Sequence, residues 1–140
     1  MSDLSSGLIL TQEHLAQMRA EVASRATEEA CGLLAGQGNH VQIVIPVTNI
    51  LHDPFRFRMD PQEELNAFLL AERQGYDILA IYHSHPHGIS RPSLTDFAEL
   101  TFPGIVYLVW YQEMDIWQCR GYYMQSASKA DEIPLIISTK

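Results

Sequence analysis

Two histidines and an aspartate near the middle of the chain have spacing suited to binding a metal ion. His83 and His85 directly follow the apolar run 78–81, which has the length and composition of a buried strand. Side chains alternate along a strand, so both imidazoles point the same way and can bind one ion. Asp96 follows a loop rich in proline and glycine and can supply a third ligand. Three protein ligands and one open position are typical of a catalytic zinc site, whereas a structural site uses four.

The same residues admit an interpretation that needs no metal. Ser93 and Asp96 stand ahead of an apolar run and fit the capping box that begins a helix. The chain has six histidines, and a lone histidine is usually an ordinary surface or core residue. His87 is a rival ligand, because it would share the face of the other two in an extended chain. The proline and glycine that flank it favour a turn instead.

The stretch from His83 to Asp96 resembles the signature of the JAMM (MPN-plus) metalloproteases. It begins with His-Ser-His-Pro at His83. The seven residues 86–92 separate His85 from Ser93, and Asp96 lies three positions after Ser93. The signature also requires an upstream glutamate ahead of an apolar strand of small residues, which Glu29 provides. Segment 56–65 resembles the prokaryotic branch of the family. The resemblance implies an α/β fold, with a mixed β-sheet layered with helices in the JAMM/MPN (cytidine-deaminase-like) architecture.

The resemblance implies a zinc-dependent hydrolase, with Zn²⁺ held by His83, His85 and Asp96. Glu29 is the expected base, which takes a proton from the attacking water and passes it to the leaving amine. Alternation along the strand lets only one of two adjacent glutamates face the metal, and the family's spacing selects Glu29. Ser93 is expected to help hold the oxyanion. The cap contacts compete with these roles, so if Asp96 binds zinc, we expect its carboxylate to turn away from the reciprocal cap contact.

The resemblance also suggests a substrate. It implies hydrolysis of a peptide or isopeptide bond after the C-terminal Gly-Gly of a ubiquitin-like protein, held as an extended strand at a sheet edge. The prokaryotic branch points to a sulfur-carrier protein as this substrate and partner. A non-catalytic protein-binding module of the same fold is the alternative. The RadC-type domains associated with DNA repair share a similar His-x-His-Pro stretch and provide a third interpretation.

The composition indicates an acidic globular domain, which we expect to span residues 1–140 as one unit. Hydrophobic residues make up 46% and charged residues 19%. The net charge of −8 argues against a nucleic-acid partner and is compatible with a partner that is basic near its docking surface. No apolar run approaches the ~18 residues of a membrane span. Cys31 and Cys119 are expected to be buried thiols in a reducing, cytoplasmic setting, and a homodimer is a candidate assembly.

Hydrophobic periodicity predicts the elements that position these residues. We expect helices at 11–25, 60–75 and 93–100, and strands at 29–36, 40–47, 77–82, 105–111 and 116–123. Less regular patterns predict an edge strand at 7–10, a short strand at 55–58, a loop at 126–132, and an edge strand or packed tail at 134–137. Gly32 within a strand predicts the close approach of a neighbouring group. The loop 88–92 is a candidate gate over the site.

Overall fold

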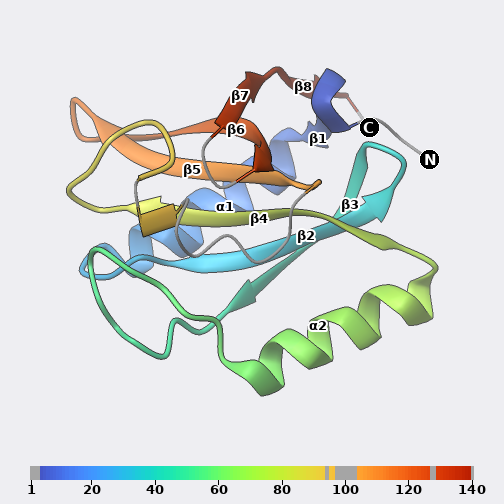
Figure 1. Ribbon diagram of the computed structural model, residues 1–140, viewed down its shortest axis with the longest axis horizontal. Coiled ribbons are helices and arrows are strands. Elements are labelled where there is room, and N and C mark those ends of the chain that lie inside the picture. The colour runs from blue at the N-terminus through green and yellow to red at the C-terminus, as the bar shows by residue number, and fades with distance from the viewer. Residues whose placement is uncertain (1–3, 94, 97–103, 127–128, 140) are drawn as a thin grey trace.

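The computed structural model describes residues 4–93, 95–96, 104–126 and 129–139. In chain order its elements are η1 (Leu4–Ser6), β1 (Leu8–Thr11), α1 (Gln12–Ser24), β2 (Cys31–Gln37), β3 (His40–Val47), α2 (Pro61–Gln74), β4 (Asp77–His85), β5 (Val106–Glu113), β6 (Ile116–Ser126), β7 (Lys129–Ile133) and β8 (Leu135–Ser138). The strands form one mixed sheet in the order β7-β6-β5-β4-β2-β3-β1-β8 (Figure 1).

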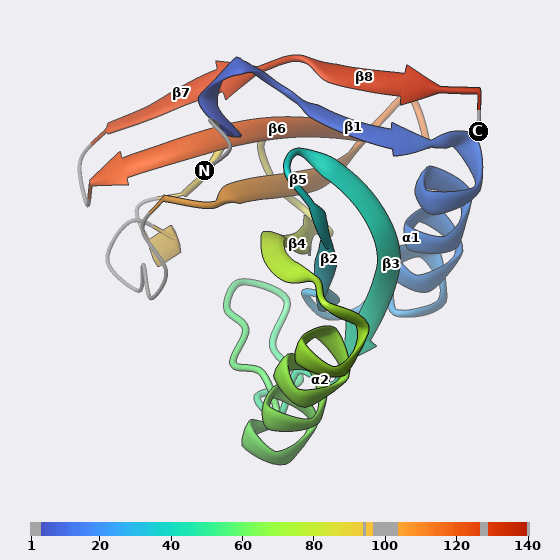
Figure 2. The same ribbon diagram turned by 90° about the vertical axis from the view of Figure 1, so that its right-hand side faces the viewer.

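Helices α1 and α2 cover opposite faces of the sheet. Helix α1 packs into the core that contains Leu34 and Tyr82, whereas α2 packs into the core that contains Leu33 and Ile81. Adjacent residues of a strand point to opposite faces, so these two cores lie on the two sides of β2 and β4. Figure 2 shows the helices lying apart around the curved sheet. The layered α/β fold with a mixed sheet is therefore confirmed.

Local capping signals set the limits of both helices. Thr11 caps α1, and its hydroxyl accepts a hydrogen bond from the backbone of His14. His14 Nδ1 accepts the reciprocal bond from the Thr11 N–H at 3.0 Å, where a capping box usually has glutamate. Asp60 caps α2, Pro61 occupies the first helical position, and Gly75 ends the helix at a left-handed φ of 75°.

Three predictions about strands were wrong. The first strand is not at an edge: β1 lies between β3 and β8, parallel to both, with Leu8 and Leu10 buried. Of the segment predicted as a loop at 126–132, residues 129–132 instead form most of the edge strand β7, whose charges are typical of a solvated edge. Segment 55–58 is irregular rather than a strand. The tail at 134–137 pairs as the edge strand β8, which was one of the two predicted alternatives.

Strand β4 is central in the sheet and delivers the two histidines to its end. It pairs antiparallel with β2 and parallel with β5, and nearly all of its residues are buried. Gly32 of β2 lies opposite Tyr82, and a Cβ at this glycine would collide with the tyrosine ring. The predicted close approach is therefore confirmed, and it fixes the packing of β2 against β4 just before the histidines.

The cysteines and the helices bear on the predicted setting. Cys31 and Cys119 are free thiols. Burial raises the pKa of Cys31 to about 12, so this thiol is protonated at neutral pH and serves as a small packing group. In the described part of the chain, neither helix has the length and apolar character needed to cross a membrane.

Candidate metal centre

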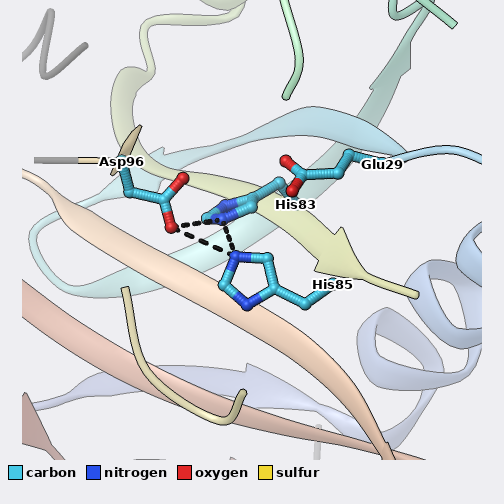
Figure 3. Close-up of side chains that lie close together, drawn as sticks. All are labelled: Glu29, His83, His85 and Asp96. Atoms are coloured by element: carbon cyan, nitrogen blue, oxygen red, sulfur yellow. Dashed lines mark hydrogen bonds and ion pairs between the residues drawn. The ribbon is translucent and has the colours of Figure 1, made fainter. Parts of the chain in front are cut away.

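Four of the predicted site residues converge where β4 ends (Figure 3). Glu29, His83, His85 and Asp96 each place one potential ligand atom within 4.8 Å of the others, and all four residues are buried. His83 Nε2 lies 3.0 Å from His85 Nε2, and each of these nitrogens lies 3.1 Å from Asp96 Oδ2. The fold thus brings together a glutamate and an aspartate that are distant in the sequence.

The two histidines share one face of β4, and the serine between them points to the other face. Ser84 Oγ accepts a hydrogen bond from the Ala30 N–H at 2.8 Å, and the Ser84 N–H donates to the Ala30 carbonyl at 3.0 Å. These bonds fix the backbone next to Glu29 against the middle of the His-Ser-His stretch. Glu29 itself precedes the strand instead of beginning it, because β2 starts at Cys31.

The three closest polar atoms carry too few protons to satisfy one another. His85 Nδ1 lies 2.8 Å from the carbonyl oxygen of Ile89, which can only accept, so Nδ1 carries the proton of the neutral ring. His85 Nε2 and the Asp96 carboxylate therefore both present lone pairs, and only His83 Nε2 can supply a hydrogen. A metal ion would satisfy all three atoms together.

The spacing of these atoms also suits a metal ion. Tetrahedral zinc with bonds of about 2.0–2.1 Å separates its ligand atoms by about 3.3 Å. The observed separations are 3.0 Å between the imidazoles and 3.1 Å from each imidazole to the carboxylate. The side chains need to move apart by only a few tenths of an ångström, so the residues fit a metal ion.

Burial and charge act in opposite directions on the pKa values in this cluster. Burial alone would lower the pKa of His83, but the charge and hydrogen bond of Asp96 outweigh it and raise that pKa. Burial alone would likewise raise the pKa of Asp96, but the charge and hydrogen bond of His83 and the backbone N–H of Ser93 lower it well below its ordinary value. When no metal ion is bound, His83 and Asp96 therefore form a buried ion pair at pH values below the raised pKa of His83.

Asp96 keeps its capping contact while it faces the histidines. The Ser93 N–H donates to Asp96 Oδ2 at 2.7 Å, and the Asp96 N–H donates to Ser93 Oγ at 3.1 Å. The expectation that Asp96 turns away from the cap when it binds zinc stays a prediction. In the structure, one carboxylate oxygen accepts from Ser93 and also approaches both imidazoles. Ser93 Oγ accepts in the cap, so its own O–H is available to donate. The helix predicted at 93–100 lies mostly outside the described residues, although Thr95 and Asp96 are helical.

The segment between β3 and α2 contributes aromatic contacts that we did not predict. The Phe57 ring stacks on the His83 imidazole, with centroids 5.0 Å apart and planes 25° apart. Phe55 contacts His87, with ring centroids 5.9 Å apart. His87, the rival ligand, is exposed and does not join the cluster formed by the described residues. The Phe-Arg-Phe-Arg alternation was the signal in the sequence, but it suggested a strand and not a ring placed on a ligand.

A cavity of about 180 Å³ lies directly beside the cluster. It is lined by Glu29, Pro54, Phe55, His85, His87, Gly88, Ser93 and Thr95. The lining combines two members of the four-residue cluster, Ser93 and the aromatic residue Phe55. A group bound in this cavity would therefore contact both the polar residues and Phe55.

Two consecutive carbonyl groups of the loop after β4 accept hydrogen bonds that hold this loop beside the site. Ile89 O accepts from His85 Nδ1, and Ser90 O accepts from the Tyr122 hydroxyl of β6 at 2.7 Å. The Gly88 N–H donates to the His85 carbonyl at 3.2 Å, and a Cβ at Gly88 would lie 2.7 Å from the His85 Cβ. Only glycine fits this turn without displacing His85. The role of the loop as a gate stays a prediction.

Comparison with known proteins places this arrangement in a known class. A family described as "Prokaryotic homologs of the JAB domain" matches residues 11–120. A desampylase of Pyrococcus furiosus is 26% identical over 136 residues, which cover 97% of this chain and 95% of that protein. A probable TtuB-protein conjugate cleaving protease of Thermus thermophilus is 41% identical over 86 residues, or 61% of this chain and 57% of that protein. A CysO-cysteine peptidase of Mycobacterium tuberculosis is 31% identical over 104 residues, which cover 73% of this chain and 71% of that protein.

Solved structures agree with the fold. Protein DSY2949 from Desulfitobacterium hafniense matches with a TM-score of 0.84 and 30% identity, covering 95% of this chain and 94% of that one. AF2198 from Archaeoglobus fulgidus, a JAB1/MPN domain protein, matches with a TM-score of 0.60 and 18% identity. The match covers 95% of this chain and 99% of that chain. The mixed sheet and the buried Glu-His-His-Asp cluster are those of a JAMM-type metallopeptidase. The chain belongs to the prokaryotic branch of the JAB (JAMM/MPN) family.

Proposed function

We propose that this protein is a zinc metallopeptidase that hydrolyses the peptide or isopeptide bond after the C-terminal Gly-Gly of a ubiquitin-like protein. The observation that carries the proposal is the convergence of Glu29, His83, His85 and Asp96 within 4.8 Å at a buried strand end. Two imidazoles and one carboxylate are the ligand set of a hydrolytic zinc, and the second carboxylate is left over for proton transfer.

Each residue has a separate task in this proposal. A zinc ion held by His83, His85 and Asp96 would supply the Lewis acidity that activates a water molecule and polarises the scissile carbonyl. Glu29 takes the proton of the attacking water and delivers it to the leaving amine, which would otherwise depart as a poor leaving group. The Ser93 O–H donates to the carbonyl oxygen as negative charge develops there, a contact worth about 2.7–4 kcal/mol of barrier.

The substrate is proposed from the relatives. Their names refer to sampylation, to TtuB conjugates and to CysO with an attached cysteine, and these are conjugates of small ubiquitin-like proteins. We extend this class to the present chain, with a ubiquitin-like sulfur carrier as the substrate. Both cysteines are free, which suits a reducing cytoplasmic setting for the reaction.

The proposal is tested with zinc-loaded protein and two carrier substrates, one extended by a short peptide after Gly-Gly and one joined to a lysine side chain. Mass spectrometry should find cleavage directly after the second glycine, and a carrier ending in Ala-Ala should stay intact. Glu29→Gln should retain one zinc per chain and lose at least about 100-fold in kcat, since general acid–base catalysis contributes roughly 10²–10⁴-fold.

Three results would count against the proposal. Cleavage of the Ala-Ala carrier at an equal rate would contradict the substrate class. Undiminished turnover by Glu29→Gln would contradict the role of Glu29. Tight binding of the carrier without cleavage by the zinc-loaded parent would instead identify a non-catalytic binding module.

A further inference from the structure

Glu29 lies on irregular backbone, so the sheet does not fix its position. Strand β2 begins two residues later, at Cys31. The Glu29 N–H donates instead to the carbonyl of Asp53 at 2.9 Å, and the Glu29 carbonyl accepts from the side chain of Asn49 at 2.9 Å. Both backbone polar groups of the proposed base are thus bound to segment 49–58, which follows β3.

Asn49 is the centre of this segment. It is fully buried, at 0% exposure, and its amide makes four hydrogen bonds to backbone groups. Nδ2 donates to the carbonyls of Glu29 and Arg56, at 2.9 and 3.0 Å. Oδ1 accepts from the N–H groups of Leu51 and Arg58, each at 3.0 Å. A buried amide with every hydrogen and an acceptor oxygen in use holds its partners in one arrangement.

The same segment also contacts the other side of the cluster. Arg56 and Arg58, whose backbones are bound to Asn49, flank Phe57, and the Phe57 ring stacks on His83 at 5.0 Å. His83 Nδ1 is buried and has no hydrogen-bond partner within the described residues. The Phe57 stack therefore adds to the contact of Nε2 with Asp96 in holding this ring. Asn49 therefore connects the backbone of Glu29 to the segment that covers His83.

From these contacts we infer that Asn49 is a positioning residue for the proposed reaction, which holds the Glu29 carboxylate at its working distance from the metal ligands. The inference rests on the proposed function. Asn49 touches no reacting atom, and it acts through the backbone of Glu29 and through segment 50–58. A displacement of about 1 Å of a catalytic group can cost about 100-fold in rate, so the loss of this clamp should be visible in kcat.

Asn49→Asp tests the inference with almost no change in shape. The variant keeps the oxygen that accepts from Leu51 and Arg58, and it replaces the NH₂ group by an oxygen that faces the carbonyls of Glu29 and Arg56. The matched control is Asn39→Asp. Asn39 Nδ2 also donates to a backbone carbonyl, that of Gly7 at 3.2 Å, but it lies beyond the opposite end of β2.

The expected result separates positioning from general support of the fold. Asn49→Asp should bind one zinc per chain, keep its KM within about twofold and lose about 10- to 100-fold in kcat, while Asn39→Asp keeps the parent's values. Amide hydrogen exchange of the metal-free protein gives a readout without turnover. The Glu29 amide should exchange at least about tenfold faster in Asn49→Asp, whereas the Leu51 amide keeps its protection.

Two outcomes would overturn the inference: a folded Asn49→Asp variant with parental kcat and parental exchange at Glu29, or a variant in which kcat, KM and zinc binding all deteriorate together. If Asn49→Asp does not fold, Asn49→Ser removes the amide without adding charge and is judged by the same criteria. If the parent cleaves no carrier substrate, the proposed function fails, and the exchange rate of the Glu29 amide still decides whether Asn49 holds that residue.

Discussion

One oxygen atom, Asp96 Oδ2, connects the helix cap to the metal centre. It accepts from the Ser93 N–H at 2.7 Å and lies 3.1 Å from each imidazole nitrogen. The backbone bond orients the carboxylate toward the two imidazoles, as an outer-shell partner of a ligand does. Because the pKa of His83 is raised and that of Asp96 is lowered, the site without a metal ion holds one proton between these two ligands at pH values below the raised pKa of His83.

Zinc binding should release this proton, because a ligating imidazole must be neutral. Below the raised pKa of His83, the apparent affinity for zinc should fall about tenfold for each unit of decreasing pH. Calorimetric titration at one pH, in buffers with different ionisation enthalpies, measures the number of protons released. A binding enthalpy that is the same in all buffers near pH 6 would contradict the assignment of the proton to His83.

The same shifts set the sign of the pH dependence of stability in the metal-free protein. The raised pKa of His83 contributes stability that is fully present below its ordinary value of 6.5 and is lost as pH rises through the raised value. The lowered pKa of Asp96 contributes stability that is present above its ordinary value of 3.8 and is lost as pH falls. The ion pair therefore contributes most to stability at pH values between 3.8 and 6.5. In this range a zinc ion must displace the proton from His83 before it can bind.

Among the elements, β6 supports the ligand loop from a strand that carries no proposed ligand. The Tyr122 hydroxyl donates to the carbonyl oxygen of Ser90, and the carbonyl oxygen of the neighbouring Ile89 accepts from His85 Nδ1. Tyr122→Phe removes the hydrogen bond to Ser90 together with the hydrogen bond between the same hydroxyl and Arg120. It should weaken zinc binding by roughly 3- to 10-fold, less than the 10- to 100-fold typical of a direct outer-shell partner. Competition with a chelating dye measures the affinity.

Tyr123→Phe is the matched control for this change. Tyr123 follows in the same strand and packs against the core on the α1 face of the sheet, away from the loop. Its variant should bind zinc as the parent does. Equal losses in the two variants would show that the hydroxyl of Tyr122 supports the strand in general and not the loop.

The elements that the sequence predicted are those specified by local signals. The caps at Thr11 and Asp60 and the apolar strand ahead of His83 were read directly from residue types and spacing. Segment 126–132 was misread because the charges of an exposed edge strand have the composition of a loop. The role of Asn49 could not be predicted, because its four partners depend on how segment 50–58 folds back on Glu29. Burial of a single polar residue in a connecting segment leaves no periodic signal.

At the scale of the whole molecule, the net charge is negative, but exposed basic residues lie close to the site. The chain carries −8, yet Arg56, Arg58 and Arg91, which belong to the two segments beside the metal centre, are exposed. A partner that is basic at its docking surface, which the total charge allowed, would meet these arginines. The homodimer suggested from the sequence stays a prediction.

Removal of the metal should lower the stability of the whole domain. The proposed ligands join β4, at the centre of the sheet, to the segment at Asp96, so an ion that binds only the folded state stabilises all of it. Free zinc at 100 times its Kd contributes about 2.7 kcal/mol. For a domain of this size, that corresponds to a rise in Tm of roughly 10 °C. Differential scanning calorimetry with and without a chelator measures the shift. His85→Ala should abolish the zinc-dependent rise in Tm, because the two remaining ligands bind zinc weakly. A rise of equal size in this variant would show that the ion binds elsewhere.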